Sequence, residues 1–328
     1  MLKSLNRLLL LSALMVGIFF VAESAQALTL IPPSTEIGAV PGQKIDVEIK
    51  LFNEEQVPKI VFSDVTNFTA SGETGSPTYS FDAEPFGIAT WFEVLEGPLS
   101  IEPGQRVTIP VTINVPADAE PGGHYAALFF GSDPDKDNNN EAPQLAIGQK
   151  LGTLFLVRVD GDIVEGGAIA TFGLAEGKKK LSHLPATFEV RFGNTGNVHL
   201  RPQGSVVVKN MFGGQSANLV INESRGATLP ETIRKYETIW EKNAVNEGGF
   251  FTQLGNEWKN FAFGKYTATV NLQYGTENPT QTSDSFSFWV IPWRLIITFI
   301  VLLAVVVLLL IVFIKRYNAW VIKKAQGQ

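Results

Sequence analysis

The densest group of acidic side chains lies in residues 133–141, Asp-Pro-Asp-Lys-Asp-Asn-Asn-Asn-Glu. Asp133, Asp135 and Asp137 place carboxylates at alternate positions, as the first ligands of a calcium-binding loop do. The sixth position is Asn138, where such a loop needs glycine, and the twelfth is not the usual glutamate. The segment therefore has two interpretations, a solvated loop and a weak calcium site, of which we favour the solvated loop.

No other group of residues has the spacing of a catalytic or metal centre. His124, His183 and His199 do not form a metal-ligand pattern, and the chain has no cysteine. Thiolate metal sites and cysteine nucleophiles are therefore excluded. The sequence also lacks a Gly-x-Ser-x-Gly turn, a His-Glu-x-x-His helix and a phosphate-binding loop. We expect a protein without enzymatic activity and without a cofactor.

The longest apolar stretch predicts how the chain is anchored. Leu295–Ile314 contains no charged residue, and Thr298 is its one polar side chain. A helix of this length spans the roughly 30 Å hydrocarbon core of a bilayer. Aromatic residues flank the stretch on both sides, as they do at membrane interfaces. We expect a transmembrane helix over residues 295–314.

The two ends of the chain predict its orientation. Residues 1–27 resemble a secretory signal peptide, because Lys3 and Arg7 precede a short apolar region and small residues follow it. An uncleaved first membrane helix is the alternative. Residues 315–328 carry four cations, against one just before the span, which predicts a cytoplasmic tail. We expect a single-pass cell-membrane protein with its N-terminal domains outside the cytoplasm.

Between these ends the hydrophobic pattern predicts β-structure. Apolar and polar residues alternate through Lys44–Leu51 and Arg106–Val115, and again through Ala186–Phe192 and Tyr266–Leu272. Such alternation is typical of strands with one buried face. Proline, glycine and asparagine separate the runs, which favours antiparallel sandwiches. Glu231–Lys242 is the one segment where a short helix is an alternative.

An internal repeat indicates two copies of one module. Glu48–Asn53 resembles Glu189–Asn194, and Gly123-His-Tyr125 resembles Gly264-Lys-Tyr266, both at a spacing of 141 residues. We therefore expect an all-β protein of two tandem immunoglobulin-like sandwiches, followed by one transmembrane α-helix. The predicted domains cover residues 28–160 and 161–291.

The repeated residues have structural roles in this prediction. Asn53 and Asn194 end core strands, where an asparagine side chain can cap its own backbone or adopt a positive φ. Tyr125 and Tyr266 begin the sixth strand of each sandwich, where a tyrosine hydroxyl ties the corner to the backbone upstream.

Charge and aromatic residues limit the partners. The chain has a formal net charge of −6, and its acidic residues concentrate outside the membrane segments, which argues against nucleic acid. Trp240, Phe250, Phe251 and Trp258 gather around a Gly-Gly pair. They could form a binding surface or fill a core, and we favour the core because Phe and Trp usually lie inside.

Short motifs follow one another in a fixed order along both predicted domains. The first domain contains Val40-Pro-Gly-Gln43, Phe52-Asn53, Glu102-Pro-Gly-Gln105, Ile113-Asn-Val-Pro116 and Pro121-Gly-Gly-His-Tyr125. The second contains Leu229-Pro230, Arg234, Tyr236, Trp240 and Phe263-Gly-Lys-Tyr266. In this order the chain resembles bacterial cell-surface proteins related to the WxL-interacting protein family. The resemblance extends from the signal peptide to the basic tail.

The resemblance implies peptidoglycan binding by the first domain and surface-protein partners for the second. Its motifs are mainly structural, so it assigns no binding residue. The first domain also resembles the N-terminal half of pilus chaperones, which bind partners by strand addition. We expect a membrane-anchored protein that binds a cell-wall polymer or a surface protein. The alternative is a chaperone-like or assembly subunit of an envelope complex, acting by strand addition or helix packing.

Overall fold

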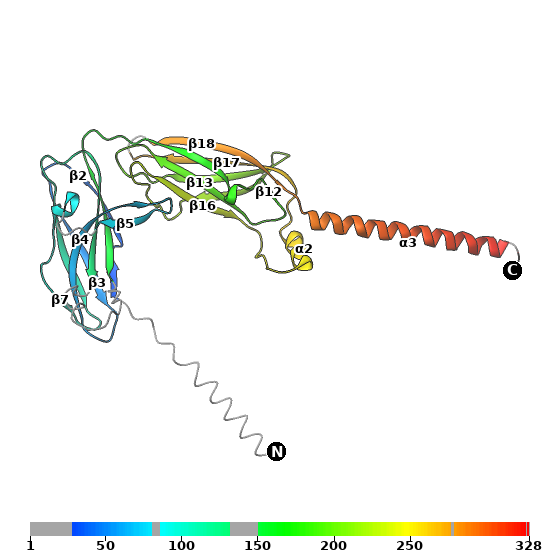
Figure 1. The fold of residues 1–328 in the computed structure, drawn as a ribbon, viewed down its shortest axis with the longest axis horizontal. Coiled ribbons are helices and arrows are strands. Elements are labelled where there is room, and N and C mark those ends of the chain that lie inside the picture. Colours follow the sequence, from blue (N-terminus) through cyan, green and yellow to red (C-terminus); the bar gives the residue numbers. More distant parts are fainter. Residues whose placement is uncertain (1–27, 81–85, 132–149, 277–278, 326, 328) are drawn as a thin grey trace, which may run out of the picture. The chain divides into compact units, whose positions relative to one another are not determined.

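The computed structural model describes residues 28–80, 86–131, 150–276, 279–325 and 327 (Figure 1). The predicted signal peptide and the calcium candidates Asp133, Asp135 and Asp137 lie outside these residues. The chain divides into two compact units. Unit 1 comprises Met1–Asn67, Ser80–Ala119 and Tyr125–Val157, and unit 2 comprises Phe68–Tyr79, Glu120–His124 and Arg158–Gln328.

Ten strands and one 3-10 turn build the N-terminal half. They are β1 Leu28–Ile31, β2 Ser34–Ala39, β3 Lys44–Asn53, β4 Lys59–Ser71, β5 Ser76–Ser80, η1 Gly87–Trp91, β6 Phe92–Glu93, β7 Leu99–Ile101, β8 Arg106–Asn114, β9 Gly122–Gly131 and β10 Leu151–Val159. One sheet has the order β1-β3-β8-β6. The other has the order β2-β10-β9-β4-β5, with β7 paired to β4.

The core of unit 1 forms between the apolar faces of these sheets. Ile49 of β3 lies opposite Ile109 of β8 in the antiparallel register, and both are buried. From the other sheet, Phe155 of β10 is fully buried and meets the ring of Phe92 at a centroid distance of 5.0 Å. The predicted alternation along β3 and β8 therefore supplies one wall of a sandwich core.

The C-terminal half repeats this plan and adds two helices. Its elements are β11 Gly167–Leu174, η2 Ala175–Gly177, β12 Lys180–Leu181, β13 Ala186–Asn194, β14 Gln203–Asn210, β15 Gln215–Ile221, β16 Ile233–Trp240, α2 Phe250–Lys259, β17 Gly264–Tyr274, β18 Thr280–Val290 and α3 Trp293–Ala325. The sheets have the orders β11-β13-β16 and β12-β18-β17-β14-β15.

Aromatic rings fill the space between the two sheets of unit 2. Phe188 of β13 meets Phe288 of β18 edge-on, with ring centroids 5.7 Å apart. Trp240 of β16 meets Tyr266 of β17 in the same manner at 5.2 Å. Such pairs contribute about 0.5–1.5 kcal/mol beyond the burial of their area. The described chain is thus all-β, with immunoglobulin-like sandwiches and one long apolar C-terminal helix, which confirms the predicted fold class.

The two repeated asparagines hold matching positions at the ends of β3 and β13. The Asn53 amide donates to the carbonyls of Val57 and Ile101, and its Oδ1 accepts the amide of Glu55. The Asn194 amide donates to the carbonyls of Val198 and Thr228, and its Oδ1 accepts the amide of Gly196. Both side chains are buried, so each ties a turn to a core strand.

The predicted corner residues Tyr125 and Tyr266 both lie on strands. The side chain of Tyr266 is buried between Trp240 and Phe288. Its hydroxyl has no hydrogen bond among the described residues, so the tyrosine corner stays a prediction. Tyr125 lies half-buried on β9.

The structure decides two local alternatives that the sequence left open. Glu231–Lys242 is not helical, since β16 occupies Ile233–Trp240 and pairs with β13 over its whole length. The short helix lies further on, at α2. Of the clustered aromatics, Trp240 is buried in the core, whereas Phe251 is 84% exposed and Trp258 is 74% exposed. The core interpretation therefore holds for Trp240 alone.

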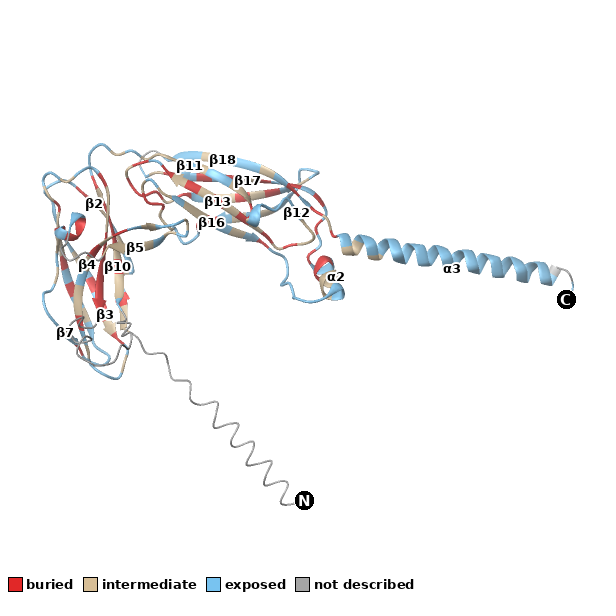
Figure 2. Ribbon diagram, viewed as in Figure 1, coloured by how far each residue is buried: buried red, intermediate tan, exposed pale blue. Residues whose placement is uncertain are grey.

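The C-terminal helix α3 exposes its apolar side chains along its length (Figure 2). Residues Trp293–Lys324 are long and apolar enough to cross a membrane, with a mean hydropathy of 3.7 in the best window and none of that window buried. The helix extends beyond the predicted span at both ends, from Trp293 to Ala325.

Replacing Asn194 with alanine should destabilise unit 2 by about 3 kcal/mol, because two buried carbonyls and one amide lose their partner. The control is Asn218→Ala on β15, where the side chain is exposed and the change should stay within about 0.5 kcal/mol. Urea unfolding of the full chain in detergent, followed by near-UV circular dichroism, measures both. Equal midpoints for the two variants would contradict this role of Asn194.

Candidate functional site

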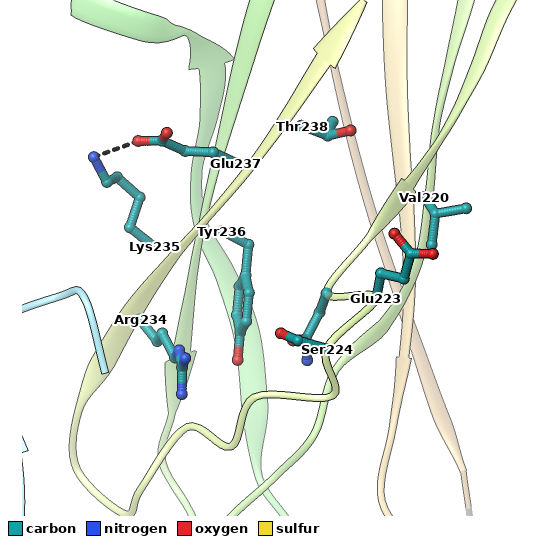
Figure 3. A pocket seen from close by; sticks show the side chains of 9 residues that line it. Val220, Glu223, Ser224, Arg234, Lys235, Tyr236, Glu237 and Thr238 are labelled. Carbon is teal, nitrogen blue, oxygen red and sulfur yellow. Dashed lines mark ion pairs between the residues drawn. The ribbon is translucent and has the colours of Figure 1, made fainter. Parts of the chain in front are cut away.

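The two sheets of unit 2 each end in an edge strand, and these edges adjoin one another. β16 is the last strand of its sheet, β15 is the last strand of the other, and the two are in contact. Between them lies an open groove of about 610 Å³ (Figure 3). Its lining residues are Val220, Asn222, Glu223, Ser224, Arg234, Lys235, Tyr236, Glu237 and Thr238. An unpaired strand edge is a template for another extended chain.

Alternation along β16 divides the lining into two kinds of side chain. Tyr236 is buried, whereas Lys235 and Glu237 point to the opposite side of the strand and form an ion pair of 2.6 Å (Figure 3). Successive side chains of a strand point to opposite faces. One face of β16 therefore contributes the Tyr236 ring to the groove lining, and the other face contributes Lys235 and Glu237.

The hydroxyl of Tyr236 fixes the floor of the groove. It lies 2.8 Å from the Thr228 hydroxyl and donates to the Gly226 carbonyl at 3.0 Å. Burial raises the pKa of the Tyr236 phenol, although the Thr228 hydrogen bond and the nearby cationic Arg234 oppose that shift. The ring therefore stays neutral and cannot rotate freely.

Arg234 is held beside this ring. Its guanidinium donates to the Ala227 carbonyl at 2.6 Å and lies 5.5 Å from the centroid of the Tyr236 ring. A Cβ added at Gly226 would come within 2.6 Å of this guanidinium, so the turn must approach Arg234 without a side chain. The cation is thus fixed in place by the turn that precedes its strand.

Asn222 shapes the opposite side of the groove. It has a φ of 55°, which asparagine tolerates better than most residues. Its amide donates to the carbonyls of Pro202 and Gly226, and its Oδ1 accepts the Gly226 amide. The turn after β15 is therefore closed by one side chain, which leaves Glu223 and Ser224 exposed at its tip.

A network of charges covers the outer face of the β13–β16 pair. Lys235 lies between Glu237 and Glu189, and Arg191 contacts Glu189 at 3.5 Å and Glu73 at 2.7 Å. The hydrogen bond that Lys235 donates to Glu237 raises the pKa of Lys235, and the one that Arg191 donates to Glu73 raises the pKa of Arg191. These side chains are solvated, so their ion pairs contribute little to stability.

The backbone of β16 shows which groups face outward. Within unit 2 the Lys235 amide donates to the Glu73 carbonyl at 2.7 Å. Backbone groups of an antiparallel strand alternate between its two sides, so those of Glu237 and Ile239 point the same way as those of Lys235. The backbone N–H groups of Glu237 and Ile239 therefore point to the same side of β16 as the Lys235 N–H that bonds Glu73.

A second depression of about 620 Å³ lies around Arg158, Asp160, Asp162 and Glu165. Glu165 accepts hydrogen bonds from Arg158 at 2.6 Å and from both the amide and the hydroxyl of Thr276. Burial raises the pKa of Glu165, but the Thr276 and Arg158 hydrogen bonds outweigh it, so the pKa is lowered. The Glu165 carboxylate thereby joins Arg158, near the end of β10, to Thr276, just after β17, and we call this set of contacts the Glu165 clamp.

The described residues contain no group of three His, Cys, Asp or Glu side chains that could hold a metal ion. His124 and His183 bond backbone carbonyls at 2.9 Å and 2.6 Å, and His199 is buried. Asn53 and Asn194 are not among the residues that line the groove; they end the core strands β3 and β13.

Sequence reasoning missed the groove. Arg234 and Tyr236 belong to the series of short motifs in the second predicted domain. Those motifs do not show that β16 is the edge strand of its sheet. The signal available was Glu223-Ser-Arg-Gly226, a polar turn between two alternating segments.

Comparison with protein-family models finds no match, and comparison with curated proteins finds none either. Among solved structures, the class 5 fimbriae chaperone CfaA is similar over 81% of this chain and 100% of its own, with 10% identity and a TM-score of 0.38. The E. coli chaperone DraB is similar over 80% and 97%, with 12% identity and a TM-score of 0.34. The Pseudomonas aeruginosa CupB2 chaperone matches over 78% and 98%, with 10% identity and a TM-score of 0.34. Likenesses at these identities and scores carry no conclusion about function.

The Glu165 clamp predicts a pH dependence of stability. Because the folded pKa lies below the ordinary value of 4.5, the clamp stabilises the protein above that pH and is lost as pH falls through the folded pKa. The free energy of unfolding of Glu165→Gln should therefore differ from that of the parent at pH 7 and converge with it toward pH 3. Urea unfolding at several pH values measures this, and a difference that is constant with pH would contradict it. Thr276→Val, which lacks the hydroxyl donor, should shift the transition to higher pH.

Proposed function

We propose that this protein is a non-enzymatic, single-span protein of the bacterial cell envelope that binds an extended segment of a protein partner. The partner's segment adds to the outer edge of β16, beside the groove between β15 and β16. The observation that carries the proposal is the pair of outward-facing backbone positions at Glu237 and Ile239, next to a preformed groove. In strand addition, backbone hydrogen bonds supply affinity and side-chain pockets supply specificity.

The side chains around the edge support this mode of binding. Val220 is 62% exposed and Ile239 is 51% exposed, so apolar surface flanks the groove on both strands. Arg234 and Tyr236 form its fixed polar floor, and Lys235 with Glu237 forms its charged rim. An apolar border with a few fixed polar groups is typical of peptide-binding sites.

The anchor places this site outside the cytoplasm in our proposal. Residues Trp293–Lys324 meet the length and hydropathy of a membrane span. Arg294 precedes the apolar stretch, whereas Lys315, Arg316, Lys323 and Lys324 follow it. That asymmetry favours a cytoplasmic tail, with both sandwiches on the outer face. Membership of the WxL-interacting protein family, with a surface protein as the partner, is part of this proposal.

The wall polymer is the competing ligand. The family resemblance assigns peptidoglycan to the first domain, whereas the groove lies in unit 2. Polysaccharide binding does not need an outward backbone donor on a strand edge. The experiment below therefore separates the two ligands by a change to the backbone alone.

Replacing Glu237 with proline should abolish partner binding, whereas Glu237→Ala should retain it. Both variants lose the carboxylate and its ion pair with Lys235, but only proline removes the outward N–H. A photo-crosslinking residue at position 239 in intact cells, followed by mass spectrometry, measures binding. We expect one dominant protein partner, with a yield reduced at least tenfold by proline.

A crosslinker moved from position 239 to 237, both within β16, should shift the labelled site by two residues along one segment of the partner, because paired strands advance in step. Equal yields for the proline and alanine variants, or capture of peptidoglycan fragments alone, would contradict strand addition at β16.

A further inference from the structure

The helix α2 has the opposite polarity from a helix packed on a protein core. Its buried positions are polar, with Asn256 3% exposed and Glu257 fully buried, and Asn260 just after the helix is also fully buried. Its exposed positions are aromatic, with Phe251 84% and Trp258 74% exposed. Figure 2 shows both burial classes on this short helix. In water, an arrangement of this kind leaves large apolar side chains without a covering.

Most polar atoms of the inward side chains have local hydrogen-bond partners, whereas the buried Nδ2 of Asn260 has none among the described residues. The Asn256 amide donates to the Asn246 carbonyl at 2.8 Å, and its Oδ1 accepts the Asn246 amide. The Oδ1 of Asn260 accepts the Asn243 amide at 2.9 Å. Residues 243–246 are thereby tied to the polar face of α2, which fixes the direction of the aromatic face.

Glu257 joins α2 to the start of α3. One carboxylate oxygen accepts a hydrogen bond from Arg294 at 3.0 Å, and the other accepts the Leu295 amide at 2.9 Å. The first amides of a helix lack partners within the helix, and a carboxylate there also interacts favourably with the helix dipole. Glu257 is therefore a positioning residue that holds α2 beside the point where the apolar helix begins (Figure 1).

The outward aromatic residues form one face. Phe251, Leu254 and Trp258 follow one another at helical spacings of three and four, and Phe261 and Phe263 continue the exposed series. Phe263 directly precedes Gly264, which pairs with Val290 just before α3. The aromatic face, defined as Phe251, Trp258, Phe261 and Phe263, thus lies at the end of unit 2 from which α3 leaves.

We propose that α2 lies in the interface of the lipid bilayer, with this aromatic face inserted among the phospholipids. The inference rests on the membrane anchor of the proposed function. Because Glu257 bonds the backbone of Leu295, α2 lies about one helix diameter, roughly 10 Å, from the chain entering the hydrocarbon. A helix with an apolar face at that depth lies in the plane of the membrane. Trp289 and Trp293, 44% and 46% exposed, flank the turn from β18 to α3, and exposed tryptophans next to a span are typical of membrane interfaces.

Insertion would give unit 2 two attachments to the membrane. The span α3 alone would allow the sandwich to tilt, because four residues separate Val290 from the predicted span. A second contact through α2 fixes the face of unit 2 that meets the lipid. The β15–β16 groove would then be presented at a constant orientation.

Nitroxide labels measure the depth of each segment, because the chain has no cysteine of its own. Single variants Phe251→Cys, Leu308→Cys and Gln281→Cys are labelled in the full chain, reconstituted in vesicles of phosphatidylcholine and phosphatidylglycerol. Gln281 is the control, since it is exposed near the start of β18, at the end of that strand farther from α3. Labels at 251 and 308 should collide mainly with oxygen, and the label at 281 mainly with a water-soluble nickel complex.

The label at position 308 tests the membrane span separately from the insertion of α2. A lipid-exposed label at 308 with a water-exposed label at 251 would overturn the insertion of α2 and leave the span intact. A water-exposed label at 308 would overturn the span and the inference together. In Glu257→Ala, collisions of the label at 251 with the nickel complex should rise at least threefold. Glu257→Gln retains an acceptor for the Leu295 amide and should show a smaller rise. An unchanged label in Glu257→Ala would overturn the positioning role.

Discussion

Burial of one apolar sheet face against another, without any cysteine, is the constraint on which this protein depends. A fully buried Phe or Leu stabilises a fold by about 1.5–3 kcal/mol relative to exposure, and each unit gathers many of them between two sheets. Disulfide-containing immunoglobulin domains link the sheets covalently. Here Ala127 and Ala268 lie fully buried two residues after Tyr125 and Tyr266, and Phe188, Phe192 and Phe288 fill the core of unit 2 in their place.

The same constraint explains why Asn53 and Asn194 are buried. A sandwich core needs turns that return each strand to the correct face, and a buried turn leaves carbonyls that must find donors. One asparagine amide satisfies two carbonyls and its oxygen satisfies one amide in each unit. The side chain contributes polar contacts at the border of the core, where a hydrophobic residue would leave those groups unpaired.

Sheets that bury their faces still expose their edges. In unit 2 the edges of the two sheets adjoin, and Tyr236 and Asn222 hold the surrounding turns in place. Soluble proteins commonly protect such edges with charges, and Lys235 and Glu237 occupy those positions in β16. The open edge and the inverted polarity of α2 are thus two departures from a self-contained domain. The open edge of β16 favours binding of a strand from another protein, and the exposed aromatic side chains of α2 favour contact with lipid.

Local pattern determined much of this protein. Alternation located the strands β3, β8, β13 and β17, the repeat identified two modules, and length with composition identified the apolar helix, because each of these signals lies within a short segment. Tertiary structure decided the rest. Whether β16 is an edge or a central strand depends on which strands pair with it, and whether Trp240 or Trp258 is buried depends on residues distant in sequence. Glu257 meets Arg294 and Leu295 across 37 and 38 residues, and no periodicity within α2 could reveal that its polar face, rather than its aromatic one, turns inward.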